Sequence, residues 1–470
     1  MGTEASAMPN YRRATALMTA TSVLVPAVGL ITAPLLAQGL GADGRGQLAA
    51  ALGPATLMLG TATLGLPDAL TYFVAKHPSI TRRALLWSAT ATLGAGATSV
   101  FVVWWFLPFL SAGDEDLARL IFLATVCQVP ALGVGVLRGA ATGRQMWELV
   151  AAERVVLSLT RMVSLFVLYG MGQLTVSSAL LVSVAAPALS GIVYTRLVTS
   201  PPASDDEVPR RRQVASPLFR YGLSAWFGGV ALMWTGQFAG ILMVPLSDAT
   251  ELGLYVVATT IADVPILVAM SIQGALFGVS SRSPDPQRVA TTARLTVIIA
   301  TAGCLALGAT LPVWLGTVFG NEFSAATMPT LIRLLAAVVM VPGLMASSSL
   351  RAWGRPALRS AVLAATLAVN LILFILLVPT LGASGASWAA LAGAVVHTIL
   401  GVSASARTTN SRGLDYVLPR RGDFRQLWHE TAGLATKVAQ STRMKRARTS
   451  GAASEDAAKG IAPSSVDDLT

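Results

Sequence analysis

Long apolar stretches alternate with short polar loops from about residue 15 to residue 403 of the chain. Each stretch has about 20 residues or more, which is the length that a helix needs to cross about 30 Å of hydrocarbon. Proline interrupts several of them, and a membrane helix tolerates proline where neighbouring helices satisfy its backbone. The pattern predicts about twelve membrane-spanning helices, near residues 15–38, 47–74, 84–110, 117–137, 149–169, 175–197, 217–244, 253–279, 292–316, 327–350, 358–379 and 384–403.

Composition places the chain in the same class. Of its 470 residues, 54% are hydrophobic and only 12% are charged, whereas a soluble protein carries about 25% charged residues. The net charge is +11, and in a membrane protein such an excess is expected in cytoplasmic loops that face anionic lipid. The sequence has no basic soluble domain of useful size, so nucleic acid is not an expected partner.

Basic residues gather in every second loop, and the alternate loops are short and mostly acidic, as in "SAGDEDLA", "PLSDATEL" and "FGNEF". Arg45 and Arg119 are the exceptions. Because short cytoplasmic loops are rich in Lys and Arg, this asymmetry predicts an even number of spans with both termini in the cytoplasm. The basic loops hold Arg12, Arg13, Lys76, Arg82, Arg83, Arg138, Arg144, Arg196, Arg210, Arg211, Arg212, Arg220, Arg282, Arg288, Arg351, Arg355 and Arg359.

The spans divide into two related halves. Each half has a short outer loop, then a glycine (Gly46 and Gly253), then a span with an internal proline. Six spans separate the two copies, which predicts two bundles related by a pseudo-two-fold axis along the membrane normal. The expected units are the N-terminus (1–14), a six-helix bundle (15–197), a linker (198–216), a second six-helix bundle (217–403) and a basic cytoplasmic tail (404–470).

The tail has two interpretations. Its apolar residues between 423 and 440 fall roughly on one face of a helix, which favours an interfacial amphipathic helix. A solvated tail with a few apolar residues explains the same pattern. From Thr449 onward the composition is typical of disorder.

Three segments resemble polysaccharide flippases of the multidrug/oligosaccharidyl-lipid/polysaccharide (MOP) exporter superfamily. They are "LLAQGLGADGRGQLAAALGPATLMLGTATLGLPDAL", the region around the turn "GRP" (354–356), and "NLILFILLVPTLGASGASWAALAG". They occur in the order and spacing of that family, and the resemblance covers residues 12–403. It implies two six-helix bundles around a central cavity, and alternating access that moves undecaprenyl-linked sugars to the outer leaflet of the bacterial cytoplasmic membrane.

The span near 149–169 carries charge that hydrocarbon disfavours by roughly 3 kcal/mol for an arginine. Arg154 and Arg161 are seven residues apart and share a helix face with Ser158. A stripe facing a wet cavity would avoid this penalty and offer guanidinium groups to a lipid pyrophosphate. The alternative is structural, because Glu153 or another carboxylate can neutralise an arginine and Arg154 can snorkel to the interface.

Two acidic residues are candidates for ion coupling. Asp263 lies about ten residues into its span, where a buried carboxylate suits H⁺ or Na⁺ coupling. Its alternative role is to cap a half-helix beginning at Pro265. Asp68 follows Pro67 and has the same two interpretations, of which we favour the structural one.

Three further residues, Arg333, Gln237 and Arg144, complete the candidate substrate site. Arg333 is expected near the outer end of its span, as part of a ring for phosphate release or paired with Glu322. Gln237 is a candidate for hydrogen bonds to sugar hydroxyls, as is Asn370, although helix joining is the favoured interpretation of each. Arg144, with Arg138 in the same cytoplasmic loop, is a candidate for collecting an anionic head group at the entrance.

Enzymatic and metal signatures are missing from the sequence. Cys127 and Cys304 both lie in apolar stretches, and the three histidines are far apart, so no metal-ligand spacing occurs. The chain has no Walker A motif and no long outer loop for a polymerase active site. No catalytic activity and no cofactor are expected, apart from a coupling H⁺ or Na⁺.

These observations predict a flippase for lipid-linked oligosaccharide in surface polysaccharide biosynthesis. The expected partners are a polyprenyl-phosphate-linked glycan, membrane lipids, and glycosyltransferases or a polymerase. A cation-coupled multidrug exporter of the same superfamily is one alternative, which a cavity richer in acids would favour. A peptidoglycan-precursor flippase is another, although that branch usually has about fourteen spans. A third is a membrane scaffold without transport, whose tail recruits glycosyltransferases.

We predict that Ser450 is cytoplasmic, because the loops before it alternate between basic and acidic without a break. A reporter fused after Ser450 should therefore be active only in its cytoplasmic form. Exposure of the reporter outside the cell would remove an odd number of spans from the predicted topology.

Overall fold

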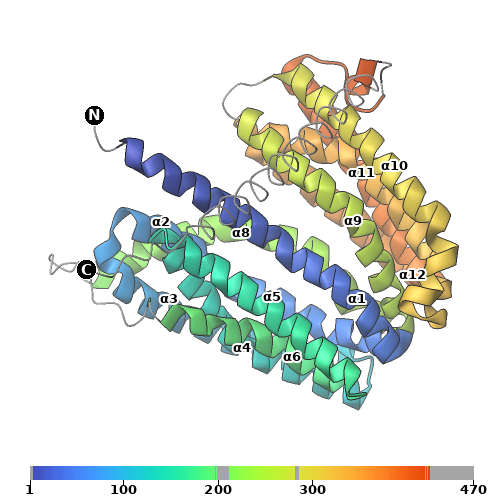
Figure 1. Ribbon diagram of the computed structural model, residues 1–470, viewed down its shortest axis with the longest axis horizontal. Helices are drawn as coiled ribbons and strands as arrows, with labels where there is room; N and C mark the ends of the chain where they lie inside the picture. Colours follow the sequence, from blue (N-terminus) through green and yellow to red (C-terminus); the bar gives the residue numbers. More distant parts are fainter. Residues whose placement is uncertain are drawn as a thin grey trace, which may run out of the picture.

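The computed structural model describes residues 4–195, 197, 211–280, 285–418, 420 and 422–423, and these are almost entirely helical (Figure 1). Short 3₁₀ turns lie at Pro78–Ile80 (η1), Gly191–Tyr194 (η2), Asn321–Ala326 (η3) and Gly413–Tyr416 (η4). The long helices are α1 (Glu4–Ala62), α2 (Leu66–Lys76), α3 (Thr81–Leu110), α4 (Glu115–Gly143), α5 (Trp147–Gly170), α6 (Val176–Ser190), α8 (Arg211–Leu246), α9 (Ala249–Ser280), α10 (Pro286–Phe319), α11 (Thr327–Ala352) and α12 (Pro356–Thr409).

Eight helices among the described residues are long and apolar enough to cross a membrane by length and composition. Two of these segments have 54 residues each, more than twice the length of about 20 that one crossing needs: Val23–Lys76, which combines most of α1 with α2, and Pro356–Thr409, which is α12. Each is broken by a glycine. Counting each broken helix twice and adding α5 and α8 gives the twelve helical segments that the apolar pattern predicts, so the all-α polytopic fold is confirmed.

The connections at two of these breaks are shorter than the sequence indicates. We expected outer loops in "GLGADGRG" and "TLGASG", and this expectation is wrong. The helix is interrupted only at Gly41 (φ 69°, ψ −177°) and at Gly382 (φ 53°, ψ −131°). Glycine adopts these positive φ values without the penalty that a Cβ atom imposes, so the chain changes direction at a single residue in each place.

A polar side chain or a proline lies at the start of several other helices. Asp114 accepts hydrogen bonds from the first turn of α4, and Thr175 and Ser178 form a capping box at the start of α6. Asp285 caps α10 in the same way, and Pro286 occupies its first position. These caps satisfy N–H groups that have no partner within the helix.

The helices form two groups that converge at one end and diverge at the other (Figure 1). One group contains α2 to α6, and the other contains α9 to α12, with α11 packed against α9, α10 and α12. Helix α1 contacts both groups through α4, α5 and α9. The converging end carries the loops that the charge pattern places outside the membrane, and we call it the outer end.

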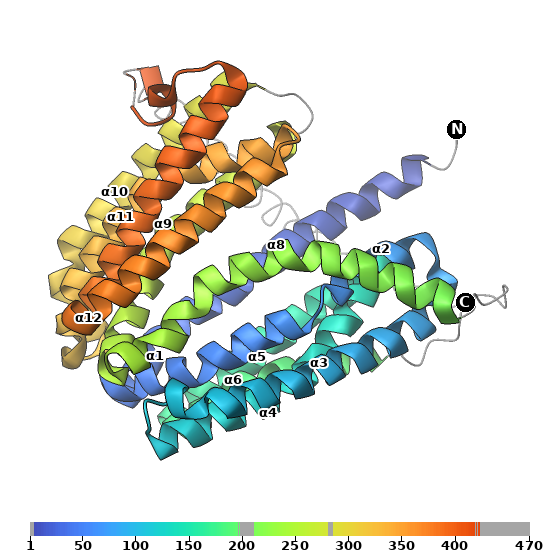
Figure 2. The same ribbon diagram turned by 180° about the vertical axis from the view of Figure 1, so that it is seen from behind.

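Helix α8 lies across the two groups. We expected it in the second bundle, and it does contact α9 and α12, but it packs more extensively along α1 and α2 (Figure 2). The indole nitrogen of Trp226 donates a 2.8 Å hydrogen bond to the carbonyl oxygen of Thr61. The backbones of Gly65 and Gly222 also meet there, with no room for a Cβ atom on Gly65.

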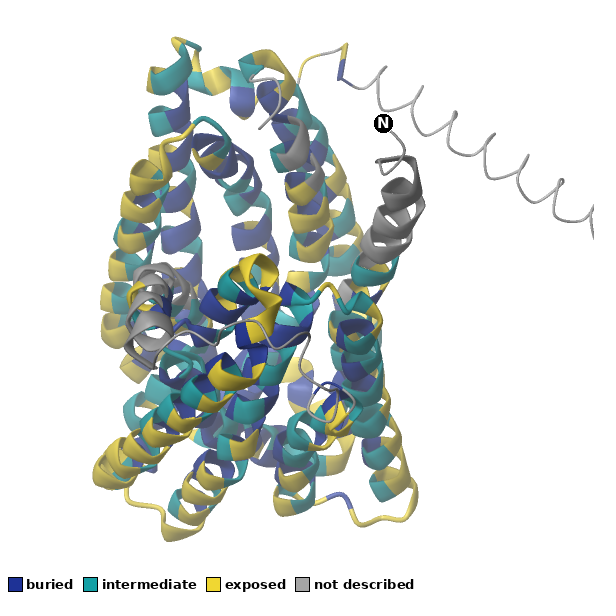
Figure 3. Cartoon of the chain, turned by 90° about the vertical axis from the view of Figure 1, so that its left-hand side faces the viewer, coloured by how far each residue is buried: buried dark blue, intermediate teal, exposed yellow. Residues whose placement is uncertain are grey.

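The largest buried cluster lies at the outer end and draws side chains from both groups, including Leu48, Leu180, Leu252 and Phe374. Buried positions face the helix interfaces, and many large apolar side chains remain exposed on the outer surfaces (Figure 3). Such exposure suits hydrocarbon, which is as apolar as these side chains.

The chain after α12 folds back onto the second group, which the sequence analysis did not predict. Helix α12 continues to Thr409, beyond the expected end at 403. The guanidinium of Arg294 on α10 donates to both carboxylate oxygens of Asp423, at 2.6 and 3.1 Å, and to the carbonyl oxygen of Asp415 at 2.6 Å. Both side chains of the ion pair are about 6% exposed. The interfacial helix expected at 423–440 lies, from 424 onward, outside the described residues.

Protonation of Asp423 should release this segment. Its hydrogen bonds with Arg294 lower the pKa of Asp423 below the usual value, so the contribution to stability is present above the ordinary Asp pKa of about 3.9 and is lost as pH falls through the lowered value. We predict that Asp423→Asn accelerates amide hydrogen exchange in Gly413–Tyr416 at neutral pH by at least about tenfold, because the buried arginine loses its counter-ion. Asp415→Asn is the matched control, because Arg294 bonds only its backbone. Unchanged exchange in Asp423→Asn would contradict the prediction.

Candidate functional site

The arginines of α5 lie where the sequence places them. Arg154 and Arg161 are half-buried, and Ser158 between them is buried. The Nε atom of Arg161 and the hydroxyl of Ser158 are buried without a hydrogen-bond partner among the described residues. This face of α5 therefore carries polar groups that the described part of the protein does not satisfy.

A third arginine joins this face from α1. Arg45 lies one turn after the break at Gly41, and its charge is close enough to that of Arg161 for the two to repel each other. Its Nε atom is also buried without a partner. Neither arginine forms an ion pair with a described carboxylate. Two half-buried cations with buried Nε atoms and no described counter-ion are costly, and this arrangement favours binding of an anion.

Sequence reasoning missed Arg45 because it assigned residues 39–46 to an outer loop. The signal that identifies it is Gly41 itself. If the chain turns at one glycine, a helix starts at residue 42, and Arg45 then lies within the first turn of that helix instead of in an outer loop.

Glu153 forms an ion pair with a different arginine, Arg138. It accepts hydrogen bonds from Nε and Nη2 of Arg138, both at 2.9 Å, and a weaker one from the hydroxyl of Ser190 at 3.3 Å. Arg138 lies near the end of α4, so the expectation that it lies in a loop is wrong. Because Glu153 is fully buried and bidentate with Arg138, it does not neutralise Arg154 or Arg161.

Asp263 and Arg333 meet in the second group, on α9 and α11. Their closest atoms are 3.9 Å apart, with the Asp263 side chain 57% exposed and that of Arg333 18% exposed. Arg333 also lies over the ring of Tyr255. Helix α9 continues through Pro265 without a new start, so the capping role considered for Asp263 is wrong. Glu322, the other partner considered for Arg333, bonds the backbone of α1 instead.

The remaining candidates are dispersed. Asp68 is exposed in the first turn of α2, where the helix dipole favours an acid. Arg144 ends α4, and Gln237 is half-buried on α8. Asn370 packs against Gly393, joining the two halves of α12. None of them hydrogen-bonds to Arg154 or Arg161 within the described part of the chain.

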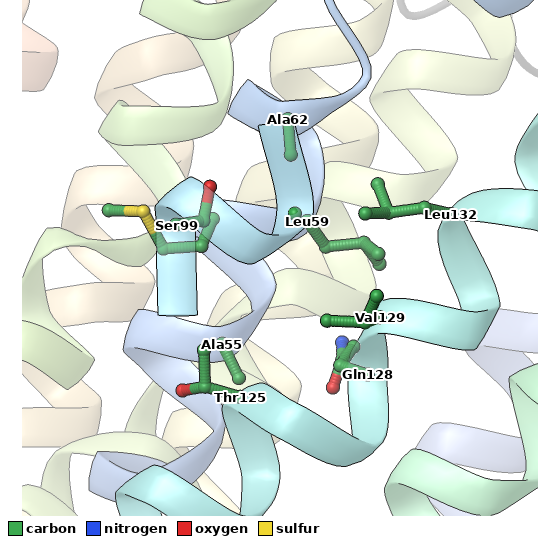
Figure 4. Close-up of a pocket in the computed structure, with 10 residues that line it drawn as sticks. Ala55, Leu59, Ala62, Ser99, Thr125, Gln128, Val129 and Leu132 are labelled. Carbon is green, nitrogen blue, oxygen red and sulfur yellow. The ribbon is translucent and has the colours of Figure 1, made fainter. Parts of the chain in front are cut away.

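A small pocket lies inside the first group between α1, α3 and α4 (Figure 4). Its volume is about 10 Å³, which is the space of a single water molecule. The side chain of Gln128 lines it, and its carbonyl oxygen is buried without a partner in the described residues. The pocket suits one water molecule and is too small for a sugar or a phosphate.

Metal ligands do not gather anywhere in the described ranges, where no group of three or more His, Cys, Asp or Glu side chains is close enough to hold an ion. His397 is buried, with Ser347 and Thr366 hydroxyls 3.3 and 3.4 Å from its two ring nitrogens. It therefore joins α11 to both halves of α12.

Several solved structures share this architecture. A lipid II flippase, MurJ, in an inward closed conformation aligns with a TM-score of 0.68 and 12% identity, over 85% of this chain and 89% of that chain. An inward-facing multidrug resistance MATE family transporter of the MOP superfamily aligns with a TM-score of 0.61 and 15% identity, over 81% and 94%. The MATE multidrug transporter DinF-BH aligns with a TM-score of 0.53 and 17% identity, over 89% and 98%.

These similarities and the twelve helical segments define a multi-pass membrane protein with the fold of the MOP exporter superfamily, as the sequence resemblance implies. The family model described as "Polysaccharide biosynthesis protein" matches residues 12–283, which is more than half of the chain. The protein belongs to this family. Among curated proteins, none matches the chain.

Proposed function

We propose that the protein moves a polyprenyl-linked oligosaccharide across the cytoplasmic membrane by alternating access, for the assembly of a surface polysaccharide. Membership of the polysaccharide biosynthesis family supports the glycan part of the substrate. The observation that carries the rest is the pair Arg45 and Arg161, two neighbouring cations with buried Nε atoms and no described counter-ion.

The chemistry of these arginines fits a phosphate or pyrophosphate linkage. A guanidinium group is always charged and donates in a planar fork that matches two phosphate oxygens. A diphosphate carries at least two negative charges, so it would relieve the repulsion between Arg45 and Arg161 while pairing with both. A neutral sugar or an uncharged drug would leave both charges unpaired at the same cost.

The arrangement of the helices supports an inward-facing starting state. The two groups converge at the outer end and diverge at the other (Figure 1), which under the predicted topology faces the cytoplasm. In the proposed cycle, the head group enters between the groups and pairs with the arginines, while the polyprenyl chain stays in the lipid. Closure of the inner end and opening of the outer end then deliver the glycan outside.

Energy coupling is assigned to Asp263. Its carboxylate is more than half exposed and only loosely paired with Arg333, so an ion or a proton can reach it. In the proposal, binding of H⁺ or Na⁺ weakens this pair and changes the packing of α9 against α11. Glycosyltransferases and a polymerase in the same membrane would supply and consume the substrate.

The alternative functions differ from the proposal in the charges, the number of helical segments or the effect of variants that they predict. A cation exporter needs unpaired acids facing its substrate, whereas Arg45 and Arg161, which are half-buried and have no described counter-ion, are cationic. A peptidoglycan-precursor flippase of the MurJ type shares the fold, but the twelve segments seen here are fewer than the fourteen usual for that branch. Under the scaffold alternative, deletion of the tail after Asp423 would abolish function and substitution of Arg161 would not.

We predict that Arg161→Ala abolishes transport of a lipid-pyrophosphate substrate, by at least about a hundredfold, and that Arg161→Lys retains part of it. Lysine keeps the charge but loses the guanidinium fork. Arg45→Ala should lose transport to a similar degree. The measurement is delivery of labelled lipid-linked sugar to the outer leaflet of proteoliposomes, normalised to folded protein.

Arg138→Met with Glu153→Met is the matched control, because it removes a buried charge pair outside the proposed site and should retain transport if it folds. Full transport by well-folded Arg161→Ala would exclude the substrate-site role of Arg161.

We predict that Asp263→Asn abolishes transport driven by an ion gradient and leaves insertion into the membrane intact. The amide cannot be protonated and holds no charge for a cation. Uphill transport should be measured at several external pH and Na⁺ values. Normal gradient-driven transport by this variant would leave Asp263 without a coupling role.

A further inference from the structure

The outer end is closed by direct contact between backbones of the two halves. Gly46, after the break in α1, lies against Ala249 of α9, and Gly253 of α9 lies against Ala42. A Cβ atom on either glycine would clash with the carbonyl oxygen opposite it. The two glycines that the sequence repeat relates are thus the two that permit this crossing.

A carboxylate also forms a hydrogen bond at the same crossing. Glu322, in the turn η3 between α10 and α11, accepts a 2.9 Å hydrogen bond from the backbone N–H of Ala42. This N–H is the first one after the break at Gly41, and it has no partner within its own helix. The bond therefore joins the second group to α1 at the residue where α1 changes direction.

Gln38 adds a neutral contact at the same place. Its side-chain amide donates to the carbonyl oxygen of Val318 at 2.8 Å, and its carbonyl oxygen accepts from the hydroxyl of Tyr169 at 3.0 Å. The end of α10, the break in α1 and the end of α5 are thereby linked in one row across the outer end.

Glu251 makes the same kind of bond at the other glycine break. It accepts a 2.6 Å hydrogen bond from the N–H of Ala383, directly after Gly382. Both Glu251 and Ala383 belong to the second group, so this bond does not cross between the groups. Among the described residues, the break at Gly41 is thus capped by a carboxylate from the second group, and the break at Gly382 by a carboxylate within that group.

We propose that Glu322 is a latch of the outer gate, which holds the outer end closed by capping the broken helix of the other half. The proposal rests on the alternating access of the proposed function. To open the outer end, η3 must leave Ala42, and Gly46 must separate from Ala249. Because a carboxylate is stabilised at a helix N-terminus, leaving the cap costs free energy that neutral outer contacts do not supply.

The test is the distance between the groups at the outer end, without substrate. Spin labels on Met171→Cys and Thr380→Cys report it, because both residues are exposed and lie in different groups. Cys127 and Cys304 are replaced by alanine, and the full chain is measured in nanodiscs. We expect Glu322→Ala to raise the ratio of open to closed molecules about fivefold, which corresponds to about 1 kcal/mol for a lost helix cap.

Two variants separate a latch from a general loss of stability. Glu322→Gln keeps an acceptor oxygen and should shift the distances in the same direction by less. Glu251→Ala removes the cap inside the second group, so it should lower the melting temperature but leave the distance distribution unchanged. If Glu322→Ala does not fold, the test is the shift of the outer-end distances in Glu322→Gln.

Unchanged distances in both Glu322 variants, or an equal shift in Glu251→Ala, would overturn the latch. The outcome is separable from that of the substrate proposal, because the distances are measured without substrate. Loss of transport in Arg161→Ala with unchanged distances in the Glu322 variants would support the substrate site and reject the latch. Full transport by Arg161→Ala together with shifted distances in the Glu322 variants would support the latch and reject the substrate site.

Discussion

Hydrocarbon offers no hydrogen bonds, so every backbone N–H and carbonyl group within the membrane must find its partner in the protein. Helices meet this demand along their length but leave N–H groups free at each start. The starts of α4, α6, α9 and α10 use local Asp or Thr caps. The breaks at Gly41 and Gly382 have no local cap, and carboxylates from distant segments, Glu322 and Glu251, satisfy them. The geometry of the outer end follows from this requirement.

The arginines of the described helices differ in whether a carboxylate pairs with them. Arg138 and Arg294 each face a buried carboxylate in bidentate geometry, and these pairs hold α4 to α5 and the end of the chain to α10. Arg45 and Arg161 have no such partner among the described residues. Pairing is therefore available elsewhere in the same protein, but the unpaired state is not confined to this site, because Arg359 on α12 also has a buried Nε atom without a described partner. Under the proposed function, an anion from outside the chain pairs with Arg45 and Arg161.

Apolar length predicted the helical segments well, because one crossing needs about 20 residues whatever their order. Arg161 was identified as a candidate from the sequence, since a cation within an apolar helix is a local signal, and its role stays a prediction. The misses involve partners distant in sequence. Arg294 and Asp423 are 129 residues apart, and nothing in either segment indicates the other. Pro265 suggested a helix start at Asp263, but within a membrane helix the neighbours satisfy the backbone and the helix continues.

The two halves are related by the pseudo-repeat in their backbone, but their charged side chains differ. Gly46 and Gly253 are equivalent in the repeat and meet at the crossing. The unpaired guanidinium groups, however, lie on α1 and α5, whereas Asp263 and Arg333 lie together on α9 and α11. The two halves thus share a related backbone but differ in their charged groups. A coupled transporter requires both substrate binding and ion coupling, and the charges suggest a different half for each. In the proposed function, the first half binds an anion, the second half contains a pair that an ion can loosen, and the crossing between them transmits movement from one half to the other.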